Sequence, residues 1–465
     1  MKWTLAENRS LRFTTLCALY VAQGIPWGFV TVTFAAWLTG EGVERAQLGP
    51  IIAVATLPWS FKFLWGPVVD RRLFAGLERR RPWILIAQTA AILALSSLLL
   101  IEDPAQLIKP AADANRIWRS VYHVVPGPLA AVILLANVFV SMQDVAVDAL
   151  AVDVLRPDER GLANGLMYGS SYLGTAIGGA GLGWVVHRFG IQAGLLAQAG
   201  CLTAIMILPL LVRERPQSSE ADVHPQSDDL RPQNERIPED SVPTEVDFGE
   251  AVLLPDADGD GSVLKNLLKA FSLRSTLIAA GIALIVKMGI GVLSVFLIPY
   301  LINDQGWTED RYTALLGGWA MATGLSGAVI GGALADRIGV RPMSVGVSAA
   351  LALLWMGVAL TPAAMTSDRA LTAMILLQEG LFGMLSATLF AFFMQVSWPK
   401  VAATQFTTYM ALMNLSTTLG SYLAGWLGED ISFSQILITA GIVQLLVALP
   451  ILLVDEQQTQ RILGR

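Results

Sequence analysis

Twelve apolar segments, each long enough to cross a lipid bilayer as a helix, dominate this sequence of 465 residues. A helix rises about 1.5 Å per residue, so roughly 20 apolar residues cross a hydrocarbon layer of about 30 Å. The segments form two sets of six, at residues 12–38, 45–66, 83–101, 128–153, 162–186 and 192–212, and at 275–302, 310–335, 343–362, 370–395, 404–428 and 433–454. With 54% hydrophobic and 15% charged residues, the composition fits an all-α membrane protein.

A polar stretch separates the two sets and is rich in Pro, Gln, Ser, Asp and Glu. We predict a six-helix bundle at 1–213, an acidic linker at 214–270 and a second six-helix bundle at 271–465. Lys and Arg concentrate in the loops on the side of the N-terminus, so both termini and the linker are predicted to be cytoplasmic. Asp256, Asp258 and Asp260 imitate the opening of a calcium loop, but Leu267 replaces the closing glutamate, and no metal or cofactor is expected.

An internal repeat relates the two halves. The string GPVVDR at 66–71 ends the second segment, GALADR at 332–337 ends the eighth, and an Arg-Pro pair follows each. The fifth and eleventh segments also align without gaps, with Gly178 on Gly420 and Gly183 on Gly425. Two like-oriented halves of six helices are the sequence signature of the major facilitator fold, in which the first, fourth, seventh and tenth helices line a central cavity. We therefore predict twelve transmembrane helices in two pseudo-symmetric six-helix bundles.

The fourth segment carries a polar stripe. At about 100° per residue, Asn137, Ser141, Asp144 and Asp148 share one face of an otherwise apolar helix. A carboxylate at the centre of a membrane costs about 2.5–3.5 kcal/mol, so it normally faces a cavity or a partner. We predict proton coupling by both aspartates and substrate binding by Asn137. The alternative is a buried ion pair with Lys62 or with the arginines at 71–81.

Charged and polar side chains also occur in the first, seventh and tenth segments. Lys287 and Glu379 fall at similar depths and are predicted to face each other, Lys287 for substrate and Glu379 for protons. A permanent structural salt bridge between them is the alternative. Gln23 and Trp27 are predicted to line the binding site, although packing of helices explains them equally well.

The paired loops suggest a gate on the cytoplasmic side. An acidic side chain at a helix N-terminus gains about 0.3–1 kcal/mol and can form a contact that breaks when the two halves move. The simpler alternative is that these charges only obey the positive-inside bias. The predicted gate residues are Lys62, Asp70, Arg71, Asp153, Asp336 and Arg337.

Three strings resemble the muropeptide permease (AmpG) family of the major facilitator superfamily. They lie at 35–71, at 143–161 (QDVAVDALAVDVLRPDERG) and at 403–416 (ATQFTTYMALMNLS). The resemblance implies import of anhydromuropeptides, sugar-peptides derived from peptidoglycan, driven by the proton gradient. It also implies that Gln143 and Asp144 take part in substrate or proton handling.

The expected function is therefore a proton-coupled importer of the bacterial inner membrane, acting as a monomer on a small-molecule substrate, with no nucleic-acid partner. Two alternatives stay open: a carrier or exporter of another amphipathic anion such as an acyl-CoA, and a non-transporting membrane sensor. The sequence has no Walker motif, catalytic triad spacing or metal-ligand cluster, so an enzyme is not expected.

Overall fold

The computed structural model describes residues 4–69, 78–108, 127–156, 159–214, 262–398, 401–427, 431–455 and 458–463. These residues are almost entirely helical, and the isolated β-bridge among them joins Thr4 to Arg213. Helices suit a bilayer because they satisfy their own backbone hydrogen bonds without water. The predicted fold class is confirmed.

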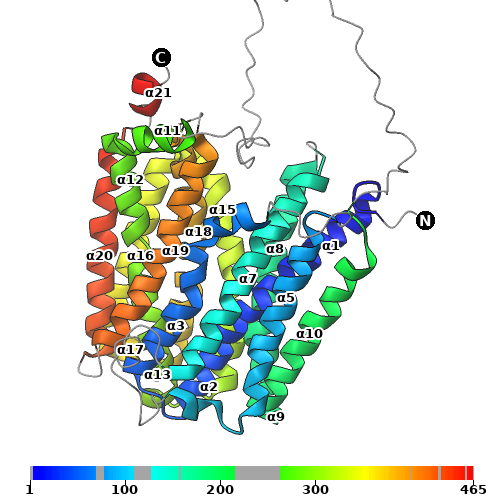
Figure 1. Cartoon of the computed structure of the whole chain (residues 1–465). Helices are drawn as coiled ribbons and strands as arrows, with labels where there is room; N and C mark the ends of the chain where they lie inside the picture. The colour runs from blue at the N-terminus through cyan, green and yellow to red at the C-terminus, as the bar shows by residue number, and fades with distance from the viewer. Residues whose placement is uncertain are drawn as a thin grey trace, which may run out of the picture.

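The first half follows the predicted segments closely (Figure 1). Its helices are α1 (Arg9–Gly28), η1 (Phe29–Phe34) and α2 (Ala35–Gly40); α3 (Arg45–Ser60), η2 (Lys62–Trp65) and α4 (Gly66–Val69); α5 (Arg81–Ser96) and η3 (Ser97–Leu100); η4 (Pro104–Ile108); α7 (Gly127–Val154); α8 (Arg160–Ala176), η6 (Ile177–Gly181) and α9 (Leu182–Phe189); and α10 (Ile191–Leu211).

The second half repeats this order. Its helices are α11 (Ser262–Phe271); α12 (Arg274–Ile285), α13 (Met288–Pro299) and η8 (Tyr300–Asp304); α14 (Glu309–Ala314), η9 (Leu315–Trp319) and α15 (Ala320–Ile338); α16 (Val340–Ala359); α17 (Pro362–Met365); α18 (Asp368–Val396); α19 (Ala402–Leu427); α20 (Phe433–Leu453); and α21 (Gln458–Leu463). Nine helical stretches of the described residues are long and apolar enough to cross a membrane. The remaining three predicted segments contain α3, which has only 16 residues, and the glycine-bearing stretches α8–α9 and α19.

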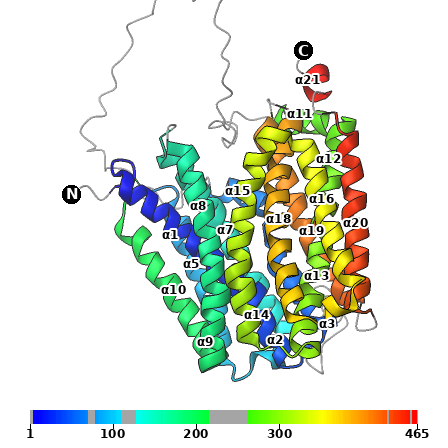
Figure 2. The ribbon, with the colours of Figure 1, turned by 180° about the vertical axis from the view of Figure 1, so that it is seen from behind.

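The two halves pack as related bundles (Figures 1 and 2). In the first half α1 packs along α8, and in the second half α13 packs along α19. Across the interface, α3 packs on α19 and α8 on α15, which are again equivalent pairs. The sequence alignment of the fifth and eleventh segments predicted this correspondence.

Glycines make the equivalent contacts possible. A β-carbon at Gly178 would clash with the Ile25 carbonyl oxygen of α1, and one at Gly420 would clash with the Met288 carbonyl oxygen at the start of α13. Helix backbones approach this closely only where side chains are small, as is usual in membranes. The aligned glycines therefore fix the same helix pair in both halves.

Contacts between the bundles concentrate at the end of the molecule farther from the two termini. There the Arg45 guanidinium donates to the Ile431 carbonyl oxygen at 3.3 Å, and the His187 ring lies 3.9 Å from the Asp310 carboxylate. Nearer the middle, the Thr56 and Thr418 hydroxyls hydrogen-bond at 2.8 Å. In Figures 1 and 2 the bundles splay apart toward the face that carries both termini. The conformation is therefore closed at the far end.

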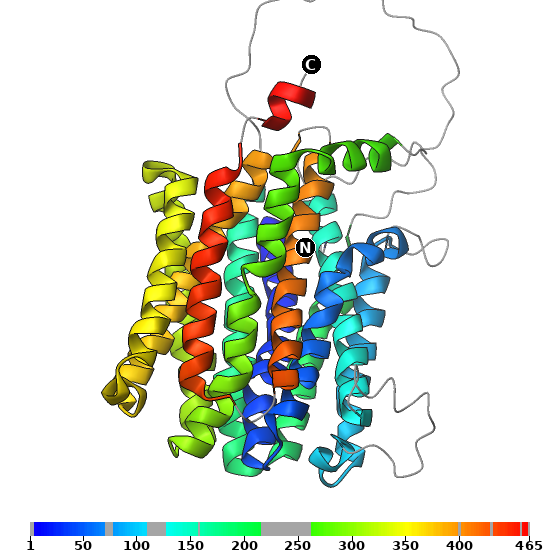
Figure 3. The same ribbon diagram turned by 90° about the vertical axis from the view of Figure 1, so that its left-hand side faces the viewer.

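The structure describes residues at both ends of the predicted linker, 214–270. Glu214 still belongs to the first bundle, where its carboxylate accepts hydrogen bonds from the backbone N–H groups of Arg80 and Arg81 at 2.8 and 2.6 Å. At the other end, α11 runs across the terminal face of the second bundle (Figure 3), where Ala270 packs with Trp398. Burial of apolar side chains thus converts the end of the expected linker into a helix. The calcium-like aspartates at 256–260 lie outside the described residues.

Candidate functional site

The centre of the candidate site is an ion pair on the polar face of α7. The Lys62 Nζ atom lies 2.9 Å from Asp144 Oδ2, and their side chains are only 21% and 8% exposed. The α-helix α3 ends at Ser60, and the following turn η2 directs Lys62 toward α7. Lys62 was predicted as a gate residue, but it lies beside Asp144. The buried ion pair named as an alternative is the geometry observed.

Asp148 lies one helical turn further along the same face and has a different partner. The Tyr20 hydroxyl of α1 donates a hydrogen bond to Asp148 Oδ1. Sequence reasoning missed Tyr20, although it shares a face of α1 with Gln23 and Trp27 at helical spacing. Asp144 is thus held by a cation and Asp148 by a neutral phenol.

The rest of the polar stripe is hydrogen-bonded within the first bundle. The Trp65 indole N–H donates to Ser141 Oγ at 3.1 Å, and the Asn137 amide donates to the Ile133 carbonyl oxygen of its own helix at 2.9 Å. Asn137 is buried, so its predicted contact with substrate is not available in this conformation.

Gln143 lies on another face of α7. Its amide donates to the Gln88 side chain of α5 at 2.9 Å, and the Gln88 amide donates to the Leu202 carbonyl oxygen of α10 at 2.7 Å. This buried chain ties three helices of the first bundle together. The role in substrate or proton handling that the family resemblance implied for Gln143 stays a prediction, and in this conformation its amide donates to Gln88.

Of the predicted residues of the first helix, Trp27 lies at an aromatic contact between α1 and α3. The Trp27 and Trp59 rings meet edge to face with centroids 5.6 Å apart. Gln23 Nε2 and Trp59 Nε1 are buried donors with no acceptor in the part of the chain that the structure describes. A buried donor without an acceptor costs about 1–3 kcal/mol, so these atoms are suited to a ligand or to water. Trp59 also touches the second bundle, since Asn414 donates to its carbonyl oxygen at 3.4 Å.

In the second half, Lys287 and Glu379 do not form the predicted ion pair. Lys287 sits at the break between α12 and α13, where its backbone N–H donates to Ser416 Oγ at 3.1 Å. Its ammonium group lies 5.2 Å from the centroid of the Phe382 ring. Glu379 instead accepts from the Gln378 amide at 3.3 Å, and Gln378 in turn accepts from the Trp355 indole at 2.7 Å.

Two tyrosines of α8 extend the site toward Glu379. The Tyr168 and Tyr172 rings meet edge to face with centroids 5.5 Å apart. The Tyr172 ring and the Glu379 backbone both lie beside Gly324 of α15. The first bundle thereby reaches from the charged cluster on α7 to the acid of the second bundle. The sequence offered no separate signal for these tyrosines.

Near the terminal face, buried arginines hold the ends of the helices. The Arg80 Nε atom lies 2.9 Å from Asp153 Oδ2, and its guanidinium also donates to the Val69 carbonyl oxygen at 3.1 Å. The predicted gate residues Asp70 and Arg71 lie outside the described residues, as does the side chain of Asp336, while Arg337 is exposed at the end of α15.

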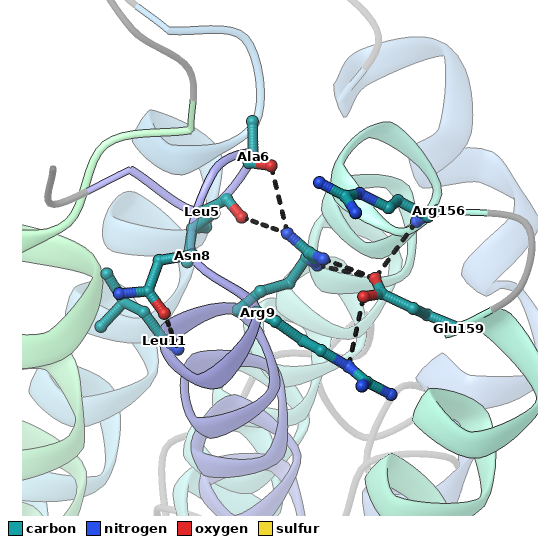
Figure 4. A network of polar contacts seen from close by, with 8 residues as sticks. Leu5, Ala6, Asn8, Arg9, Leu11, Arg156 and Glu159 are labelled. Carbon is teal, nitrogen blue, oxygen red and sulfur yellow. Dashed lines mark hydrogen bonds and ion pairs between the residues drawn. The ribbon is translucent and has the colours of Figure 1, made fainter.

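A second arginine cluster joins α1 to the loop before α8 (Figure 4). The Arg12 guanidinium donates to the Glu159 carboxylate and to the Leu5 carbonyl oxygen at 2.7 Å, and Arg9 lies 3.3 Å from Glu159. Burial by itself raises the pKa of Glu159, but hydrogen bonds from the Arg12 side chain and the Arg156 backbone lower this pKa below its usual value. The sequence analysis did not identify this cluster.

The site is thus a set of ionisable groups on helices of both bundles. Asp144 and Asp148 lie in α7 and Glu379 lies in α18, whereas Lys62 lies in the turn η2 and Lys287 at the break between α12 and α13. Within the described residues, no group of three or more His, Cys, Asp or Glu side chains is arranged to hold a metal ion. The chemistry that this arrangement supports is binding and release of protons and charged groups.

Comparison with known proteins assigns the chain to a family. The sequence profile of the Major Facilitator Superfamily matches residues 16–406 and, in a second match, residues 279–464. Anhydromuropeptide permease of Escherichia coli (strain K12) is 28% identical over 204 residues, which are 44% of this chain and 38% of the permease. An uncharacterized membrane protein of Saccharomyces cerevisiae is 31% identical over 165 residues, which are 35% of this chain and 29% of that protein. The matches therefore span less than half the length of these relatives.

Solved structures agree in fold. A mutant of nucleoside transporter NupG superposes with a TM-score of 0.67 at 11% identity, covering 95% of this chain and 99% of that one. The D-xylose-proton symporter superposes with a TM-score of 0.67 at 12% identity, covering 96% and 99%. With the two related bundles and the profile match, these likenesses show that the chain belongs to the Major Facilitator Superfamily and is a multi-pass membrane transporter.

Proposed function

We propose that this transporter imports anhydromuropeptides or related sugar-peptides from peptidoglycan across the bacterial inner membrane, together with protons. The observation that carries the proton coupling is the cluster of Lys62, Asp144 and Asp148 inside the membrane. Ionisable groups at that depth are expensive, and in transporters they mark ion and substrate pathways. The similarity to the E. coli permease supports the substrate class.

Alternating access would move the two bundles about the site. With both termini and the linker in the cytoplasm, the far end that is closed in this conformation faces the periplasm. In this proposal the site exchanges with the cytoplasm in the present conformation, and the inter-bundle contacts of Arg45 and Thr56 must break when the transporter turns outward. We propose that Asp70, Arg71, Asp153, Asp336 and Arg337 form the cytoplasmic gate in that state, while the Asp153–Arg80 pair lies within the first bundle and is already formed in this conformation. A single chain contains both bundles, so a monomer suffices.

Substrate recognition would use both halves. Gln23 and Trp27 offer a buried amide donor and an aromatic surface, which suit the hydroxyl groups and apolar faces of a sugar. Lys287 has an aromatic ring rather than a carboxylate beside its ammonium group, so a carboxylate of a peptide substrate can neutralise it. Lys62 and Asp144 neutralise each other, and Asn137 and Gln143 serve the packing of α7.

Uptake into vesicles tests the proposal. Purified full-length protein is reconstituted into liposomes, and labelled anhydromuropeptide is supplied outside under an imposed proton gradient. We expect accumulation above the equilibrium level, and collapse of the gradient by an ionophore should abolish it. Equilibration without accumulation would contradict proton coupling. Failure to take up the muropeptide, with uptake of a labelled acyl-CoA instead, would contradict the proposed substrate.

A further inference from the structure

The charged cluster of the first bundle has one positive side chain and two acids. Asp144 and Asp148 are one helical turn apart on α7, which places their β-carbons about 5–6 Å from each other. Lys62 is the cation beside them. If both acids were ionised, the cluster would carry a net negative charge between membrane helices, where an unbalanced charge is costly.

The geometry distinguishes the two acids. Asp144 Oδ2 lies 2.9 Å from the Lys62 Nζ atom, so a cation balances its charge directly. Asp148 accepts a hydrogen bond from the neutral Tyr20 hydroxyl and has no direct contact with a cation among the described residues. Asp148 is therefore the acid whose charge is less well balanced.

Among the residues that the structure describes, the neighbouring elements supply no second cation to Asp148. The titratable groups that face it are Tyr20 from α1, Lys62 from η2, and Asp144 from α7 itself, and Tyr168 of α8 lies close to Tyr20. The buried arginine at the start of α5, Arg80, pairs with Asp153 more than one turn further along α7. Lys62 and Arg80 thus each pair with another carboxylate of α7, Asp144 and Asp153.

We propose that Asp148 binds the transported proton, that Tyr20 positions its carboxylate, and that Asp144 and Lys62 stay paired as a fixed charge pair. This assignment rests on the proposed function and specifies which acid performs the coupling. The proton arrives from solvent, adds to a carboxylate oxygen of Asp148 and later leaves to solvent on the other side. With the proton bound the cluster is neutral, and without it the cluster is an anion that resists closure away from water.

Infrared spectroscopy of the reconstituted full-length protein tests the assignment without any substrate. The carboxylic acid C=O band is titrated with pH in the wild type and in three variants: Asp148→Asn, Tyr20→Phe, and the double variant Lys62→Gln/Asp144→Asn. The double variant removes the ion pair without changing the net charge and leaves Asp148 with Tyr20. Asp153→Asn is a matched control, because this third aspartate of α7 is held by Arg80. Glu379 is present in the wild type and in every variant, so its band cancels when the spectrum of the wild type is subtracted from that of a variant.

We expect Asp148→Asn to lose one titrating component that the double variant and the Asp153→Asn control keep. Tyr20→Phe should move that component to higher pH, by on the order of one pH unit or less, since the ionised carboxylate loses a hydrogen-bond donor. Loss of the component in the double variant, or no effect of Asp148→Asn, would overturn the assignment. The infrared titration uses no substrate, so a failure to transport muropeptides would not affect the assignment of the proton to Asp148. Likewise, a failed assignment of Asp148 would not affect the proposed substrate.

Discussion

The two halves of the molecule have the same scaffold but differ in how they neutralise charge inside the membrane. In the first half, Lys62 pairs directly with Asp144. In the second half, Lys287 lies over the Phe382 ring, and Glu379 bonds to Gln378 instead of to Lys287. The repeat therefore preserves the contacts between helix backbones, while the ionisable side chains have diverged. A transporter with such halves can assign proton binding to one and anion binding to the other.

The largest expected effect is the loss of coupling in Asp148→Asn. An asparagine cannot carry the proton, so accumulation driven by a proton gradient should fall to the equilibrium level. Exchange of labelled for unlabelled substrate without a gradient should stay within about twofold of the wild type, since the Asp144–Lys62 pair is intact. Both are measured in the same liposomes. Accumulation by Asp148→Asn would contradict the role of Asp148. The same assay on Glu379→Gln tests the second half. Exchange without accumulation in that variant would mean that Glu379 also binds a proton.

Replacing one lysine in each half, Lys62 or Lys287, compares how much each buried positive charge contributes to stability. Lys62→Gln leaves Asp144 without its cation and should destabilise the protein by about 3–5 kcal/mol, whereas the double variant Lys62→Gln/Asp144→Asn should regain most of this loss. Lys287→Gln removes no ion pair and should cost less than about 1 kcal/mol. Unfolding of the purified protein in detergent measures all three. Equal losses for the two single variants would mean that the halves do not differ as described.

The shared scaffold is tested with paired glycine substitutions. Gly178→Ala and Gly420→Ala should each destabilise the protein by about 1–3 kcal/mol, because each new methyl group would meet a carbonyl oxygen of the neighbouring helix. Gly181→Ala and Gly346→Ala are controls with room for the added methyl group. The same unfolding measurement applies. A large effect at Gly178 with none at Gly420 would break the equivalence of the two helix pairs.

The smallest expected effect is on the pH dependence of stability, and it comes from Glu159 on the terminal face of the first half. The folded protein has a lowered pKa at Glu159, so this group stabilises the fold above its unfolded pKa of about 4.5, and the stabilisation is lost as pH falls through the lower folded value. Stability of the wild type should therefore drop by about 1 kcal/mol more than that of Glu159→Gln on acidification through this range. Arg461→Gln, which affects an exposed pair with Asp455 in the second half, should change stability by less than about 0.5 kcal/mol. Parallel pH profiles for wild type and Glu159→Gln would argue against the buried cluster of Figure 4.

Several features of the fold follow from sequence patterns that act locally or by repetition. Apolar length predicted α7 at 128–153, and the helix spans Gly127–Val154. The ungapped alignment of two segments predicted that Gly178 and Gly420 occupy equivalent places, and both lie against equivalent helices. Helical periodicity also placed Ser141, Asp144 and Asp148 on one face, where they meet partners from other helices.

The partners of these side chains were decided by the tertiary structure. The turn after Ser60 brings Lys62 to Asp144, and α1 brings Tyr20 to Asp148, over separations of 82 and 128 residues. Similar depth in the membrane suggested that Lys287 and Glu379 would meet, but depth does not fix rotation about the helix axis or the break at Lys287. Periodicity within one helix determines which residues share a face, because it depends only on backbone geometry. Which face meets which helix depends on packing across the whole bundle, and so the charge pairs appear only in the folded protein.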